Sequence, residues 1–150
     1  MTNTKIIFSA FSLLAIITIA VSGFSLQQDK EPWTPQQLME PADLAKILKD
    51  PKAPHPIVFC IGPDAVIKNS IFIGPTGSKD NLAKFREQVS RLAKNAKIVI
   101  YCGCCPFNRC PNIRPAFRVM NELGLKNAKL LNLSHNVKVD WIEPGYPVND

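Results

Sequence analysis

Several features that would indicate a nucleic-acid-binding or repeat protein are missing from this 150-residue chain. Only 8% of its residues are aromatic, and its basic residues are scattered, mainly between Lys46 and Lys138, instead of forming one block. Nucleic-acid binding needs a clustered basic face or stacking aromatics at regular spacing, and neither is visible. No internal repeat or low-complexity tract is present. We therefore expect no nucleic-acid partner and no repeat architecture.

Charge is nearly absent from the first 28 residues, where Lys5 is the only charged side chain before Asp29. Residues 6–21 are almost wholly apolar, and the small residues Ser22 and Gly23 follow them. This order is typical of a secretory signal peptide. The apolar run is long for a cleaved signal, so an uncleaved N-terminal anchor stays open as an alternative. Only in that form do we expect contact with a membrane. We expect an exported protein, either periplasmic or extracellular.

The expected organisation is a signal peptide or anchor over residues 1–23, a linker over 24–36 and one domain over 37–150. Removing the first segment leaves roughly 127 residues, enough for one hydrophobic core and too few for two. The formal net charge of +6 falls to +5 without Lys5. That modest positive charge favours solubility and attracts anionic substrates weakly.

Hydrophobic periodicity predicts strands that alternate with helices. One helix is expected from Pro41 to the Asp50-Pro51 pair, a second from Ser78 to near Asn95, and a third over residues 113–123 with Gly124 as its stop. Short apolar runs predict strands over residues 56–60, 70–73, 97–101 and 128–133. This alternation predicts an α/β fold, with a small parallel central sheet and helices on both faces.

Four of the five cysteines lie within nine residues, directly after the apolar run 98–101, in the loop Cys-Gly-Cys-Cys-Pro-Phe-Asn-Arg-Cys that ends at Cys110. The carboxyl end of a parallel strand is where α/β sheets place ligands. A thiolate there would face the positive end of the next helix, and Arg109 or Arg114 would add a nearby cation. We therefore expect a reactive thiol in this loop.

The order of these segments resembles the C-terminal half of a rhodanese domain. A strand ends in Cys102, an arginine-containing loop leads into a helix ending Glu-Leu-Gly at 124, and residues 127–133 and 141–148 follow, the last ending Gly-Tyr-Pro-Val. The similarity covers about residues 33–148 and is strongest from residue 97 onward. It implies a rhodanese-like fold and a thiosulfate-type sulfurtransferase. Such an enzyme passes sulfane sulfur through a cysteine persulfide, from a small anionic donor to a thiol or to cyanide.

The resemblance also implies the residues of the site. The catalytic cysteine would be Cys102 or Cys104, and the substrate-binding residues would be Gly103, Cys105, Asn108, Arg109 and Arg114. Two criteria choose different nucleophiles. The family's loop has four residues between cysteine and arginine, which Cys104 and Arg109 satisfy, whereas Cys102 stands at the strand end with six residues before Arg109. We prefer Cys102, with Cys104 as its close competitor.

Three other interpretations of the thiols stay open. Exported domains often contain structural disulfides, here Cys102 with Cys110, or Cys60 with a loop cysteine. A redox protein would use Cys104 or Cys110 to resolve a disulfide or sulfenic acid on Cys102. A metal site for zinc or copper(I) would draw on Cys60, Cys102, Cys104, Cys105 and Cys110, although the two paired Cys-x-x-Cys motifs of ordinary zinc sites are absent. The sulfurtransferase interpretation requires no cofactor.

Outside the loop, Trp33 and Trp141 are expected to anchor the core. Ser134 and His135 follow the last predicted strand, close to the active loop in the resembling fold, although a structural role is the simpler expectation for His135. Asp140 is a candidate for a bond to the loop backbone.

Overall fold

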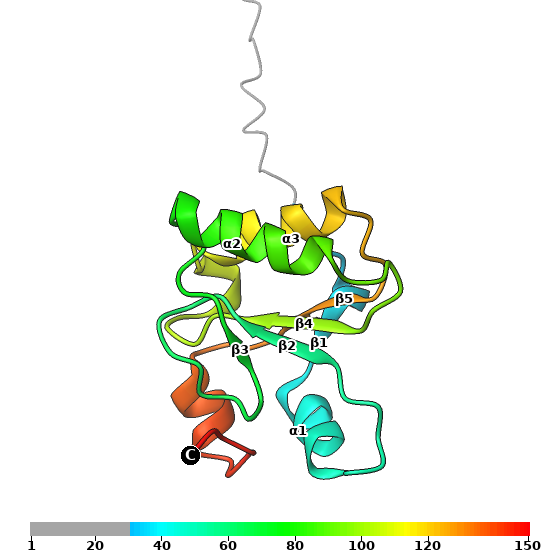
Figure 1. The fold of residues 1–150 in the computed structure, drawn as a ribbon. Coiled ribbons are helices and arrows are strands. Elements are labelled where there is room, and N and C mark those ends of the chain that lie inside the picture. The colour runs from blue at the N-terminus through cyan, green and yellow to red at the C-terminus, as the bar shows by residue number, and fades with distance from the viewer. Residues whose placement is uncertain (1–30) are drawn as a thin grey trace, which may run out of the picture.

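The computed structural model describes residues 31–150, which form a five-stranded parallel sheet with helices on both faces (Figure 1). The strand order is β1-β5-β4-β2-β3, so β4 is the central strand. The bounds of the strands are β1 Leu38–Met39, β2 Ile57–Cys60, β3 Ile71–Phe72, β4 Ile98–Tyr101 and β5 Ala128–Leu131. The predicted α/β class with a parallel sheet is therefore confirmed.

In the described part of the chain, three α-helices cover the sheet: α1 is Pro41–Lys49, α2 is Lys79–Ser90 and α3 is Ile113–Glu122. Helices α2 and α3 lie together on one face, while α1 and the π-helical segment η3, Lys138–Ile142, lie on the other (Figure 1). Parallel strands need such helical crossovers, and both faces of the sheet are consequently buried.

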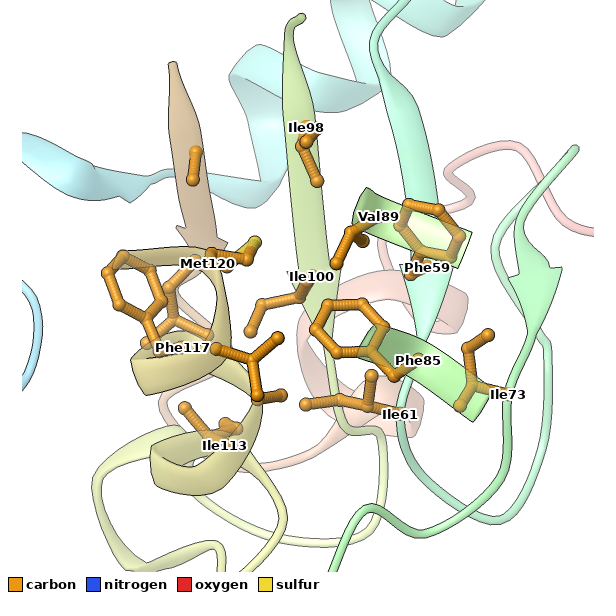
Figure 2. Packing of buried hydrophobic residues seen from close by; sticks show 14 of the residues in the cluster. Phe59, Ile61, Ile73, Phe85, Val89, Ile98, Ile100, Ile113, Phe117 and Met120 are labelled. Carbon is orange, nitrogen blue, oxygen red and sulfur yellow. The ribbon is translucent and has the colours of Figure 1, made fainter. Parts of the chain in front are cut away.

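Alternating side chains divide the strands between two hydrophobic clusters. One cluster lies on the face that α2 and α3 cover. It contains Phe59 of β2 and Ile98 and Ile100 of β4, together with Phe85 of α2 and Phe117 of α3 (Figure 2). The opposite face carries the intervening residues, among them Val58, Cys60, Val99 and Tyr101, together with Leu44 of α1 and Trp141 of η3. The alternation continues past the end of β4, so the Cys102 side chain belongs to the face covered by α2 and α3.

Helices α1 and α3 begin and end close to the predicted residues. Pro41 opens α1, where a missing backbone N–H costs no helical bond. Gly124 follows α3 with a positive φ of 67°, and the Leu125 N–H donates to the Met120 carbonyl, which together end the helix. Helix α2 ends at Ser90, earlier than the predicted Asn95. The backbone beyond it bonds elsewhere: the Lys94 carbonyl accepts from the Lys126 N–H.

Two elements carry no clear sequence signal. Strand β1 has only two residues and is defined by its pairing with β5, in the register Leu38 to Leu130. Segment η3 buries Trp141, whose ring packs edge-on against Tyr146 and whose indole N–H donates to the Pro147 carbonyl. Its position against the sheet depends on Trp141, which lies in one hydrophobic cluster with Val99 and Tyr101 of β4, and not on a helical repeat.

The signal peptide or anchor predicted for residues 1–23, and most of the linker predicted for 24–36, lie outside the described residues. Residues 31–36 pack against the domain: Trp33 is buried against Phe107 and Phe117, and the Pro32 carbonyl accepts a hydrogen bond from Asn121. Across residues 31–150, every helix is too short or too polar to traverse a bilayer.

Candidate functional site

The cysteine loop begins where β4 ends and returns the chain to α3. Cys102 directly follows Tyr101, the last residue of β4, and a short 3-10 helix, η2 (Phe107–Arg109), lies in mid-loop. Two backbone hydrogen bonds hold the loop to the segment after β5: the Val137 N–H donates to the Gly103 carbonyl at 3.0 Å, and the Phe107 N–H donates to the Leu133 carbonyl at 3.0 Å. The loop is thus fixed near both its start and its middle.

Two glycines make room for this arrangement. A Cβ atom at Gly62, just beyond β2, would lie 2.8 Å from the Cys102 Sγ and 3.2 Å from the Gly103 nitrogen. A Cβ at Gly103 would lie 2.8 Å from the Cγ1 of Val137. Both distances are below normal contact, so any larger residue would displace either the thiol or the loop.

Three sulfur atoms meet at the carboxyl end of β4. The Sγ atoms of Cys102, Cys104 and Cys110 all lie within 4.8 Å of one another. The Cys102 and Cys104 sulfurs are 3.4 Å apart, and the Cys105 sulfur lies 3.2 Å from that of Cys104. Cys102 and Cys110 are buried, whereas Cys104 is exposed. The group therefore has a buried inner part and one thiol that faces solvent.

Asn112, the residue before α3, fixes a hydrogen-bond donor toward Cys102. Its Nδ2 donates to the Cys102 Sγ at 3.3 Å, while its Oδ1 accepts from the Gly77 N–H at 2.8 Å. Because a backbone N–H can only donate, the Gly77 contact requires the amide oxygen on its own side and leaves the NH₂ group facing the sulfur. The Thr76 hydroxyl donates to the Asn112 carbonyl at 2.6 Å and holds the residue in place.

These surroundings give the three thiols different pKa values. The Cys110 thiol and the Asn112 amide, aided by the Cys104 backbone and side chain, outweigh burial and lower the pKa of Cys102 to about 5. Burial and its Cys105 and Cys102 neighbours raise the pKa of Cys104 to about 12. The contact with Cys102, together with burial, also raises the pKa of Cys110. The geometry consequently favours a Cys102 thiolate that accepts hydrogen bonds from two thiols.

The arginines expected to assist are not among the causes of this low pKa, which are hydrogen bonds. Arg114 is engaged elsewhere: its Nη2 contacts the Glu31 carboxylate at 2.5 Å and the Asn108 carbonyl at 2.7 Å, and its guanidinium lies over the Trp33 ring. Asn108 and Arg109 are exposed on the outer part of the loop. The lowered pKa of Cys102 comes from hydrogen bonds, first from the Cys110 thiol and then from the Asn112 amide.

Cys60 is separated from the loop thiols by the sheet. Its side chain lies in the cluster with Tyr101, on the face opposite Cys102, and its thiol donates to the Asp64 carbonyl at 3.1 Å. Burial raises the pKa of Cys60 and that of the neighbouring Tyr101 phenol. All five cysteines are free thiols. Of the five cysteines that the alternative metal-site interpretation would use, three come together, while Cys60 and Cys105 lie outside the mutual 4.8 Å group.

The segment after β5 supports the loop from outside. The Asp140 carboxylate accepts from the backbone N–H groups of His135 and Asn136, at 2.6 and 3.1 Å, and contacts the His135 ring. Asp140 therefore bonds to this turn and not to the cysteine loop as expected. The turn places the Val137 N–H on the Gly103 carbonyl. Asp140 and His135 thus position the loop indirectly.

Sequence reasoning missed Asn112, Gly62 and the turn containing Thr76 and Gly77. A usable signal existed for two of them. Asparagine is favoured directly before a helix, and the position before the third predicted helix is also only two residues after the last loop cysteine. Gly62 follows β2, whose carboxyl end must lie beside that of β4 in a parallel sheet.

Comparisons with protein-family models, with curated proteins and with solved structures found no match to this chain. The geometry of the site is therefore the main evidence for its function.

Proposed function

We propose that this chain is a rhodanese-like sulfurtransferase that carries sulfane sulfur as a persulfide on Cys102. The observation that carries the proposal is the position of the Cys102 Sγ, at the carboxyl end of the central strand with the oriented Asn112 NH₂ group 3.3 Å away. Nucleophilic displacement at sulfur requires a thiolate and fixed donors that stabilise it. Both requirements are supported at Cys102.

The reaction is written with thiosulfate as the donor. The Cys102 thiolate attacks the sulfane sulfur of thiosulfate, the sulfur–sulfur bond of the donor breaks, and sulfite leaves with its electron pair. The new Cys102 persulfide then meets cyanide or an acceptor thiolate, which attacks the outer sulfur and expels the Cys102 thiolate. A thiol of low pKa is a good leaving group, so the donors that stabilise the Cys102 thiolate assist the second step as well as the first.

Cys104 is proposed to gate this thiol and not to replace it. Its sulfur lies 3.4 Å from the Cys102 sulfur and is the solvent-facing member of the group. Exposed side chains change rotamer within nanoseconds, so rotation of Cys104 opens a path to Cys102 for a small donor. Its own raised pKa makes it the weaker nucleophile at neutral pH.

The same arrangement gives less support to a general thiol–disulfide oxidoreductase. Disulfide exchange with a protein substrate requires an attacking thiolate that the partner disulfide can reach. Here the thiol with the lowered pKa is buried, and the accessible thiol has the raised pKa. A small anionic substrate can reach a buried thiolate more easily than a protein disulfide can.

The test is thiocyanate formation by the full-length chain from thiosulfate and cyanide. Cys102→Ser is expected to abolish turnover, whereas Cys104→Ser should retain a substantial rate. Cys60→Ser is the matched control, because Cys60 is also a buried thiol at a strand end but lies on the other face of the sheet. Equal activity in wild type and Cys102→Ser would reject the proposal, as would wild-type protein that forms no thiocyanate.

A further inference from the structure

The three mutually close thiols also have the spacing of metal ligands. A metal–thiolate bond of about 2.3 Å, the value known for zinc, places three sulfurs of a trigonal site about 4.0 Å apart. The Sγ atoms of Cys102, Cys104 and Cys110 all lie within 4.8 Å of one another, and the first two are 3.4 Å apart. Only small side-chain shifts would therefore place one ion between all three.

Among the residues that the structure describes, the nearby groups offer no fourth protein ligand to this set. Cys60 lies across the sheet, and Cys105 is near Cys104 but outside the mutual group. Asn112 presents its NH₂ group, which cannot bind a cation, because its oxygen is held by the Gly77 N–H. Within residues 31–150, the set is three sulfurs and nothing else.

The number and softness of the three sulfur ligands decide which metal ion fits the site. Zinc in structural sites is almost always bound by four ligands in a tetrahedron, whereas thiolate ligands favour the softer Cu(I) ion. The burial of Cys102 and Cys110 also shields two sides of the position from water, while the exposed Cys104 lies on the side that faces solvent. A site of this kind suits Cu(I) better than zinc.

We propose that Cys102, Cys104 and Cys110 together bind one Cu(I) ion in a three-sulfur site. Three copper–sulfur bonds form, the thiol protons are released to solvent, and the ion enters and remains as Cu(I), so no electron is transferred. This site does not depend on the proposed sulfur transfer. Because both uses require the Cys102 sulfur, a bound copper ion and a persulfide exclude each other.

The test is an anaerobic titration of the full-length chain with Cu(I) in the presence of excess bicinchoninate, a coloured Cu(I) chelator. We expect the chain to remove one Cu(I) from the chelator and X-ray absorption to show three sulfurs at about 2.3 Å. Cys104→Ser and Cys110→Ser should each weaken binding by more than about 10-fold, because even the loss of an outer hydrogen-bond partner costs about 10- to 100-fold. Cys60→Ser and Cys105→Ser should bind as the wild type does.

The exposed position of Cys104 makes Cys104→Ser safe for folding, which circular dichroism checks. Unchanged Cu(I) affinity in Cys104→Ser, no copper uptake, or tighter binding of zinc with four sulfurs would each overturn the proposal. A chain that forms thiocyanate but takes up no copper rejects the copper site alone. A chain that binds copper and never forms thiocyanate rejects the sulfurtransferase alone.

Discussion

Replacement of Asn112 by alanine removes the one side-chain amide within residues 31–150 that donates to the Cys102 sulfur. A hydrogen bond to a charged group is worth about 1.5–3 kcal/mol, and one pKa unit corresponds to about 1.4 kcal/mol. The pKa of Cys102 should therefore rise by about 1 to 2 units from its value of about 5. At pH 6 the thiolate fraction then falls from about nine-tenths to between about one-half and about one-tenth.

The assay is the pH dependence of iodoacetamide alkylation of the full-length chain, with the label located on Cys102 by peptide fragmentation. Loss of the Gly77 contact is a rival cause, since Asn112 also accepts from the Gly77 N–H. Asn112→Asp keeps an acceptor for Gly77 but replaces the donor by a carboxylate, whose negative charge faces the sulfur. The pKa of Cys102 in Asn112→Asp should therefore be raised at least as far as in Asn112→Ala. If Asn112→Asp titrates as the wild type does, or if Asn112→Ala leaves the inflection unchanged, the reasoning is refuted.

Three further predictions concern packing and pH. Gly62→Ala should lower stability by about 1–3 kcal/mol and slow thiocyanate formation, because the new Cβ would meet the Cys102 sulfur at 2.8 Å; normal denaturation midpoint and activity would contradict this. Trp33→Ala should cost about 3–5 kcal/mol in urea unfolding, since the ring is buried against Phe107 and Phe117, and a loss below 1 kcal/mol would place residues 31–36 outside the core. Folding lowers the pKa of Cys102 from the ordinary thiol value of 9.0 to about 5. Between these two pH values the Cys102 thiol is therefore protonated in the unfolded chain and ionised in the folded chain. Wild-type stability should thus rise with pH across this window relative to Cys102→Ser, and parallel curves would contradict it.

The strand and helix pattern could be predicted because it depends on local repeats. The β-branched run of β4 and the apolar stripe of α3 define buried faces without reference to other segments. Strand β1 could not be predicted in this way, since two residues carry no period and only the pairing with β5 defines them. Helix α2 was predicted too long because contacts from the segment after α3 satisfy the backbone beyond Ser90.

The loop thiols were visible in the sequence, but the group that stabilises them was not. Arginine is the obvious partner for a thiolate, and Arg114 is instead held by Glu31 and Trp33, which lie about 80 residues away in the sequence. Asn112 acts through a contact with Gly77, 35 residues away, that orients its amide. Such orientation depends on tertiary structure, and no local spacing rule predicts it.

The most direct test of the central claim is mass spectrometry of the full-length chain after incubation with thiosulfate and removal of excess donor. The account predicts a gain of one sulfur atom that fragmentation places on Cys102, that disappears in Cys102→Ser and that cyanide removes. It predicts that Cys104→Ser still gains this sulfur. A sulfur found on Cys104 in the wild type, or an unmodified chain, would contradict the account.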